Sequence, residues 1–257
     1  MENLLDRKTF LIVGAGGLLG SKIVLEALDQ GAKIIAADVD LNSMKTRLSS
    51  VGVDIGSENL LLLEFNITEE ESVKSLFSNA IWTIDGAVNS TYPRNKTYGK
   101  HLFDVSLDSF NENLSLHLGS AFLFTQQSAA YFLKKRKQFS LVNISSIYGV
   151  VAPKFEIYEN TPMTMPVEYA AIKAAIQHLN KYVVSYVNDS GFRINCVSPG
   201  GIYDNQPDAF LDAYKNKTNG AGMLDVGDIV GSVLFLLSQQ SRYVTGQNII
   251  VDDGFSL

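Results

Sequence analysis

The chain is nearly free of cysteine: Cys196 is the only one among its 257 residues. A single cysteine cannot form an internal disulfide, and it excludes a zinc site built from several cysteines. Long apolar runs are also missing, and none approaches the roughly 18 residues that a membrane-spanning helix needs. The first residues, Met1–Asp6, are acidic and lack the basic start of a signal peptide. We therefore expect a cytoplasmic protein with no membrane association, and we predict no metal site.

Positive charge is in deficit, because 21 Lys and Arg residues face 27 Asp and Glu residues and leave a net charge of −6. An acidic surface repels phosphate backbones and anionic lipids, so we expect no binding to nucleic acid or to a membrane surface. Hydrophobic residues make up 46% of the chain and charged residues 19%. That composition is typical of a chain with a large buried core and argues against disorder.

Short apolar runs alternate with longer amphipathic stretches along the whole chain. The runs predict strands at Thr9–Val13, Lys33–Ala37, Leu60–Phe65, Ile84–Asn89, Ser140–Ser145, Arg193–Val197 and Asn248–Val251. The longer stretches predict helices at about 18–30, 41–50, 69–79, 108–136, 167–188 and 226–239. Such alternation indicates a seven-stranded parallel sheet with helices on both faces, a doubly wound, three-layer α/β fold. We expect one domain over residues 1–257 and loops at 152–166 and 199–222, at the carboxyl edge where ligands bind.

The first predicted strand runs into a glycine-rich turn, Gly14–Gly20, and then into a helix. Glycines allow a tight turn and close backbone approach to a diphosphate, which the helix N-terminus also attracts. Asp38 ends the second strand 24 residues after Gly14. Its carboxylate can accept hydrogen bonds from both adenosine ribose hydroxyls and would repel the 2′-phosphate of NADP, so the pattern favours NAD. The alternatives are a plain strand–helix turn and a solvated strand-end carboxylate.

Tyr169 and Lys173 are four residues apart on a predicted helix and therefore share one face. A free tyrosine has a pKa near 10, too high for efficient proton transfer at neutral pH, and a nearby ammonium lowers it. An ordinary amphipathic helix with a surface tyrosine and lysine is the alternative.

The context of this pair carries a family resemblance. The ordered motifs are Asn143-Ile144-Ser145-Ser146-Ile147-Tyr148-Gly149, Tyr169-Ala170-Ala171-Ile172-Lys173, Asn195-Cys196-Val197-Ser198-Pro199-Gly200 and Val244-Thr245-Gly246-Gln247. With the glycine turn and Asp38, the chain resembles the short-chain dehydrogenase/reductases over essentially its whole length. The resemblance implies that Tyr169 transfers the proton, Lys173 lowers its pKa and holds the nicotinamide ribose, and Ser146 positions the substrate oxygen. A hydride would pass between the substrate's carbinol carbon and the nicotinamide.

Two serines and two tyrosines compete for these roles. The family serine is followed by two residues and a glycine, which fits Ser146 and not Ser145. Tyr158 has Pro162 four residues beyond it, where the family has lysine, so we choose Tyr169. This choice implies an insertion of about ten residues within 150–166. The insertion is expected either to shape the substrate pocket, with Tyr158 or Glu156 touching substrate, or to be a structural loop.

The resemblance also implies a set of residues that hold the cofactor. Besides Tyr169 and Lys173, the set is Gly14, Gly16, Gly17, Leu18, Leu19, Asp38, Asn66, Ile67, Asn89, Pro199, Gly200 and Ile202. Some of its members depart from the family pattern. Leu18 replaces the second glycine, only Asn89 survives of an Asn-Asn-Ala-Gly stretch, and Asn66 replaces an aspartate near the adenine. Asp204 stands where the family has a threonine, and it is expected to accept from the nicotinamide amide unless the alignment slips there.

A further departure concerns the family's helix asparagine, which lies five residues before a phenylalanine. Counting back from Phe122 gives His117, whereas Asn113 lies one turn earlier. An imidazole can relay protons near neutral pH, so His117 is a candidate catalytic residue. A buried structural histidine is the alternative.

Two stretches, 145–158 and 245–257, resemble the oxidoreductases of bacterial flagellin-modification and nonulosonic-acid gene clusters more narrowly. This resemblance implies a sugar, sugar-phosphate or nucleotide-sugar substrate. The polar loop 203–222 weakly disfavours the alternative of a lipid-like ketone, and a dinucleotide-binding regulatory protein with little turnover is the other alternative. The family also implies a homodimer or homotetramer formed through the helices at 108–136 and 167–188.

Overall fold

The computed structural model describes residues 3–257 and contains a seven-stranded parallel sheet. The strand order is β3-β2-β1-β4-β5-β6-β7. The strands are β1 (Thr9–Val13), β2 (Lys33–Asp38), β3 (Leu60–Glu64), β4 (Gly86–Asn89), β5 (Phe139–Ile144), β6 (Phe192–Pro199) and β7 (Asn248–Val251). Every residue of β1 and β6 is buried, as expected for strands covered on both faces. The predicted α/β fold is confirmed, and no predicted strand end lies more than two residues from the observed one.

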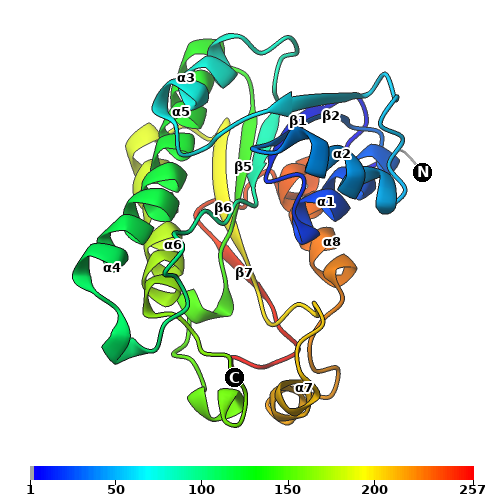
Figure 1. Cartoon of the computed structure of the whole chain (residues 1–257). Helices are drawn as coiled ribbons and strands as arrows, with labels where there is room; N and C mark the ends of the chain where they lie inside the picture. Colours follow the sequence, from blue (N-terminus) through cyan, green and yellow to red (C-terminus); the bar gives the residue numbers. More distant parts are fainter. Residues whose placement is uncertain (1–2) are drawn as a thin grey trace.

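Helices cover both faces of the sheet (Figure 1). One layer contains α1 (Leu18–Asp29), α2 (Leu41–Ser50) and α8 (Val226–Leu237). The other contains α3 (Glu70–Ser78), α4 (Leu107–Asn113), α5 (Ser120–Lys135) and α6 (Val167–Val187). Each layer buries its own apolar cluster against the sheet. Among residues 3–257, no helix is both long enough and apolar enough to cross a membrane.

The strand register brings the chemistry-bearing residues to one edge. Val13 of β1 is paired with Ala37 of β2 on one side and with Asn89 of β4 on the other. The glycine turn, Asp38 and the segment after Asn89 therefore leave the sheet side by side. The carboxyl end of β5, at Ile144, lies at this same edge, because all the strands run parallel.

Two predicted segments differ from the structure. The helix expected at 108–136 is interrupted by a π-helical stretch, Leu114–Gly119, between α4 and α5. The loop expected at 199–222 contains a helix, α7 (Asp208–Lys215). Phe210 and Tyr214 lie one turn apart on α7 and are both buried, so the helix packs by an apolar stripe that the surrounding polar residues obscure in the sequence.

Candidate active site

A cavity of about 410 Å³ opens at the carboxyl edge beside the N-terminal turn of α6. Ser146, Tyr169 and Lys173 all line it, although they come from two different segments of the chain. Ser146 follows β5, and the other two lie on successive turns of α6. The predicted cofactor residues Leu19, Pro199, Gly200 and Ile202 line the same cavity.

Lys173 is buried, and its ammonium group donates a hydrogen bond to the carbonyl oxygen of Ile144 at 2.9 Å. The same nitrogen lies 5.4 Å from the centroid of the Tyr169 ring. Burial lowers the pKa of Lys173 to about 8. Burial raises the pKa of Tyr169, and a hydrogen bond with the Ser146 side chain opposes that rise. Ser146 and Lys173, both buried, thus lie on either side of the half-buried Tyr169 at the cavity wall.

The two adjacent serines have different partners. Ser145 Oγ donates to the Lys173 carbonyl oxygen at 3.0 Å and accepts from Gln177 Nε2 at 3.0 Å, so it ties β5 to α6. Ser146 Oγ accepts from the Tyr148 amide at 3.2 Å, and it is also the side chain that hydrogen-bonds Tyr169. Of the two serines, Ser146 is therefore the one whose hydroxyl is joined to Tyr169 at the cavity wall.

His117 lies in the π-helical stretch and is buried behind the cavity wall. Its Nε2 is 3.5 Å from Lys173 Nζ. Burial first, and then the charge of Lys173, lower the pKa of His117 to about 2. The imidazole is therefore neutral at physiological pH and offers Lys173 an acceptor nitrogen rather than a second positive charge.

Asn113, the other candidate, is engaged elsewhere. Its side-chain amide donates to the Ser109 carbonyl at 3.0 Å and to Glu168 Oε1 at 3.4 Å. Its oxygen accepts from the Asn95 amide at 3.0 Å. Of the two residues, it is His117 that the structure places beside Lys173.

A second cavity, of about 590 Å³, lies over the glycine turn and shares Ser90, Thr91 and Tyr92 with the first. Its lining includes six predicted cofactor residues: Gly14, Gly16, Gly17, Asp38, Asn66 and Ile67. The Gly16 amide donates to Asp38 Oδ2 at 2.8 Å, which holds the carboxylate against the turn. A Cβ on Gly16 would approach this same oxygen to 3.1 Å. An open glycine cradle with a fixed carboxylate at its rim fits the diphosphate and ribose of a dinucleotide.

Four residues expected to contact the cofactor either line neither cavity or are already hydrogen-bonded. Leu18 starts α1 half-buried and lines neither cavity. Asn89 is buried below the lining, where its Oδ1 accepts from the Thr91 hydroxyl at 2.7 Å. The Asn66 amide nitrogen is already bonded to Glu69 Oε1 at 2.8 Å. Asp204 is exposed in its loop and lines neither cavity, whereas Gln206, two residues on, lines the catalytic cavity.

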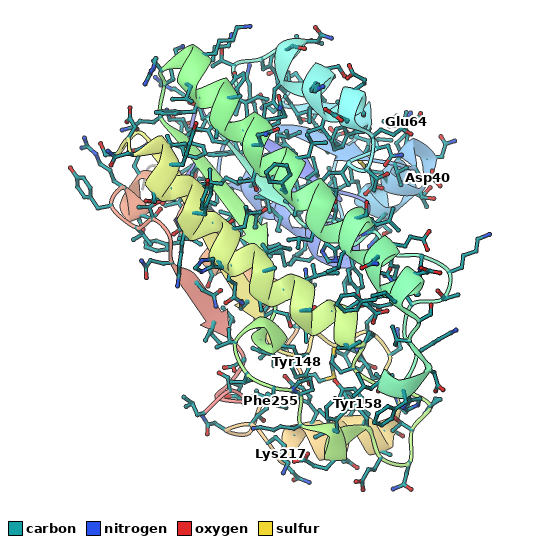
Figure 2. All side chains as sticks on the ribbon, turned by 90° about the vertical axis from the view of Figure 1, so that its left-hand side faces the viewer. Asp40, Glu64, Tyr148, Tyr158, Lys217 and Phe255 are labelled. Atoms are coloured by element: carbon teal, nitrogen blue, oxygen red, sulfur yellow. The ribbon has the colours of Figure 1, made fainter. Side chains whose placement is uncertain are left out.

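The segment 150–166 forms part of the cavity wall. Tyr158 lines the cavity, and its hydroxyl donates to the Tyr148 hydroxyl at 2.9 Å. Figure 2 shows both residues at the lower end of the molecule, near Phe255 of the C-terminal tail. Glu156 instead forms an exposed ion pair with Lys217 at 3.1 Å, on the outer surface. Of the two residues expected to touch substrate, only Tyr158 lines the cavity, and its contact with substrate stays a prediction.

The rest of this wall includes Met163 and Met165 of the expected insertion, together with residues outside it that the sequence did not point to. It consists of aromatic and methionine side chains, namely Tyr148, Met163, Met165, Phe210, Tyr214 and Met223. Apart from Gln206, the polar side chains that made the loop 203–222 look polar are exposed, so the polarity of the loop says little about the cavity. The i, i+4 spacing of Phe210 and Tyr214 is the signal that could have revealed this wall.

Comparison with known proteins places the chain in a family. A family model described as enoyl-(acyl carrier protein) reductase matches residues 14–256. The chain is similar to the post-translational flagellin modification protein A of Campylobacter coli, at 38% identity over 99% of this chain and 100% of that protein. It is also similar to a 7α-hydroxysteroid dehydrogenase of Bacteroides fragilis, at 25% identity over 99% of this chain and 96% of that protein.

Among solved structures, a short-chain dehydrogenase of Leptospira borgpetersenii with bound NAD+ superposes with a TM-score of 0.87 at 32% identity. The match covers 100% of this chain and 95% of that one. The chain therefore belongs to the short-chain dehydrogenase/reductase family of oxidoreductases. Both resemblances drawn from the sequence, to this family and to the flagellin-modification oxidoreductases, are confirmed.

Proposed function

We propose that the protein is an NAD-dependent dehydrogenase/reductase acting on a secondary alcohol or ketone, with Ser146, Tyr169, Lys173 and His117 performing the proton chemistry. The observation that carries this proposal is the convergence of Ser146, Tyr169 and Lys173 on one cavity that adjoins the glycine-turn cavity. The chemistry that bound nicotinamide supplies is hydride exchange with the substrate carbon.

Each side chain then has a separate task. Ser146 Oγ hydrogen-bonds the substrate oxygen and fixes it near the Tyr169 hydroxyl. In reduction Tyr169 donates its proton to that oxygen, and in oxidation its phenolate accepts the proton. The Lys173 ammonium stabilises the phenolate because it lies beside the ring. Neutral His117 accepts a hydrogen bond from Lys173 and extends the proton path inward.

We propose that NAD is preferred over NADP. The support is Asp38, whose carboxylate is fixed at the rim of the glycine cradle. An anion there would bind ribose hydroxyls and repel a 2′-phosphate.

For the substrate we propose a carbohydrate, as a free sugar, a sugar phosphate or a nucleotide sugar. The support is the identity of 38% over full length to a flagellin modification protein. A lipid-like ketone is the second candidate, and the aromatic and methionine wall of the cavity favours it. For the assembly we propose a homodimer or homotetramer through α5 and α6, where Phe122, Tyr182 and Tyr186 expose apolar surface.

The test is a turnover screen of the full chain with NAD+ and NADH against sugar alcohols, ketoses, their phosphates and a set of hydroxysteroids. Tyr169→Phe should reduce turnover of the active substrate by about a thousandfold, the scale of general acid–base catalysis. NADH fluorescence titration serves as the control for cofactor binding by the variant. Undiminished turnover by Tyr169→Phe would refute the mechanism, and NADH binding without turnover across the panel would favour a dinucleotide-binding regulatory protein.

A further inference from the structure

Tyr92 contacts all three groups that surround the proposed proton path. Its ring centroid lies 5.4 Å from that of Tyr169 and 5.2 Å from that of His117, in edge-on arrangements. The Lys173 ammonium lies 5.8 Å from the same centroid. Tyr92 also lines both cavities, so it stands where they meet.

The Tyr92 ring is held in place by its own segment of the chain, which follows β4. Its hydroxyl donates to the Tyr98 hydroxyl, and the two rings lie edge to face at 5.6 Å. The Arg94 guanidinium lies 4.8 Å from the Tyr92 centroid, within cation–π distance. The segment is in turn fixed to α4, because the Asn95 amide donates to Asn113 Oδ1 at 3.0 Å. The ring is therefore a fixed part of the site.

Lys173 and His117 owe their altered pKa values mainly to burial. The titratable groups around the pair are Glu168 and Tyr169 on α6, Cys196 on β6, and Tyr92, Arg94 and Tyr98 on the segment after β4. Of these, Tyr92 is the one that contacts both members of the pair and also borders both cavities. Lys173 lines the first cavity, whereas His117 lines neither of the two, and the Tyr92 ring lies against both side chains where the cavities adjoin.

We propose that Tyr92 is a positioning residue whose ring covers the His117 side of the Lys173–His117 pair, keeps cavity water from the imidazole and holds Lys173 beside Tyr169. The inference rests on the proposed function only for its catalytic meaning, because the shielding itself is a property of the folded chain. The Tyr92 hydroxyl is not needed for this shielding, because Arg94 and the edge of the Tyr98 ring contact the Tyr92 ring without it.

The first experiment measures access to His117 and requires no substrate. Diethylpyrocarbonate modifies neutral imidazoles, and mass spectrometry of the full chain follows its three histidines separately; His101 is exposed, lies outside α5 and α6, and serves as the internal reference. In the native protein and in Tyr92→Phe, His117 should react about tenfold more slowly than His101, because a buried group reacts only from locally opened states. Tyr92→Ala should raise the His117 rate about fivefold or more, with the His101 rate unchanged.

Equal His117 rates in the native protein and Tyr92→Ala would overturn the proposal, and so would equal rates in Tyr92→Phe and Tyr92→Ala. Circular dichroism checks that each variant is folded. If Tyr92→Ala does not fold, Tyr92→Leu replaces it, with the same outcomes, because leucine fills space without forming an aromatic shield.

The second experiment links the shielding to catalysis through the pH profile of turnover, with a substrate found in the screen. Tyr92→Ala should move the basic limb toward higher pH by about one unit, because water favours charged Lys173. Tyr92→Phe should leave this limb in place. An unmoved limb in Tyr92→Ala overturns the catalytic part of the inference. Retained turnover in Tyr169→Phe would instead refute the proposed function and leave the histidine measurement valid, so the two failures are distinguishable.

Discussion

Nε2 of His117 lies 3.5 Å from the ammonium nitrogen of Lys173, although the two residues are 56 positions apart. The contact depends on the π-helical stretch Leu114–Gly119, in which the widened turn changes the direction of the side chains that follow α4. A histidine buried against an ammonium stays uncharged, and its lowered pKa makes the free energy of unfolding depend on pH.

We predict that stability falls with acidification through His117. Its folded pKa, about 2, lies below the ordinary value of 6.5. Below pH 6.5 the unfolded chain therefore binds a proton that the folded chain does not, and the free energy of unfolding decreases as pH falls, by about 1.4 kcal/mol per unit. Urea unfolding at pH 7, 6 and 5 measures this slope. His117→Gln should flatten it, whereas His101→Gln, at an exposed histidine outside α5 and α6, should not. The prediction fails if the slope is the same in His117→Gln and the native protein.

We predict that Asp38→Ser changes the cofactor preference. Removing the carboxylate deletes hydrogen bonds to the ribose and relieves repulsion of a 2′-phosphate, so NADH binding should weaken about tenfold and NADPH binding should tighten. Fluorescence titration with both nucleotides measures the change. The matched control is Asp40→Ser, two residues on, because Asp40 caps α2 through the Ser43 amide at 2.9 Å. A ratio of affinities that moves equally in both variants would contradict the role of Asp38.

Two glycines should respond oppositely to alanine. A Cβ on Gly20 would overlap the carbonyl of Gly14, so Gly20→Ala should lower the free energy of unfolding by about 2–4 kcal/mol and weaken NADH binding. Gly231 is exposed on α8 with open space around it, and Gly231→Ala should stabilise the chain by up to about 1 kcal/mol. Urea unfolding of both variants measures this. An unchanged free energy of unfolding in Gly20→Ala would contradict the close packing of Gly20 against the Gly14 carbonyl.

We predict that Lys154 holds the cavity wall to the C-terminal tail. Its ammonium donates to the Phe255 carbonyl at 2.6 Å and lies 4.5 Å from the Phe255 ring centroid. Lys154→Met should cost about 1–2 kcal/mol of unfolding free energy and speed proteolysis within 150–166. Lys217→Met breaks only the exposed pair with Glu156 and should cost less than about 0.5 kcal/mol. Equal effects of the two substitutions would show that the tail contact contributes no more than a surface ion pair.

Sequence reasoning recovered the features that short stretches of chain encode. Apolar runs predicted all seven strands, because a strand buried on both faces must be apolar throughout. The spacing of Tyr169 and Lys173 was sufficient to place them on one helix face, and Pro162 was sufficient to set Tyr158 aside. Whether these residues perform the chemistry stays a prediction for the Tyr169→Phe measurement.

Other features depended on contacts between distant segments. The count back from Phe122 favoured His117 over Asn113 in the sequence, but only the packing of the π-helical stretch against α6 shows that His117 lies beside Lys173. The cavity wall became apolar because α7 turns Phe210 inward while its polar residues face solvent.

The amino-acid sequence by itself thus determined the strands, the glycine turn and the Tyr169–Lys173 pair, because each depends on residue types at short spacing. Only the tertiary structure decided the neighbours of that pair: His117 behind it, Tyr92 beside it, and the aromatic wall facing it. The physical reason is that local periodicity fixes which way a side chain leaves its own helix or strand. What it meets there is fixed by how the elements pack, which depends on the whole core.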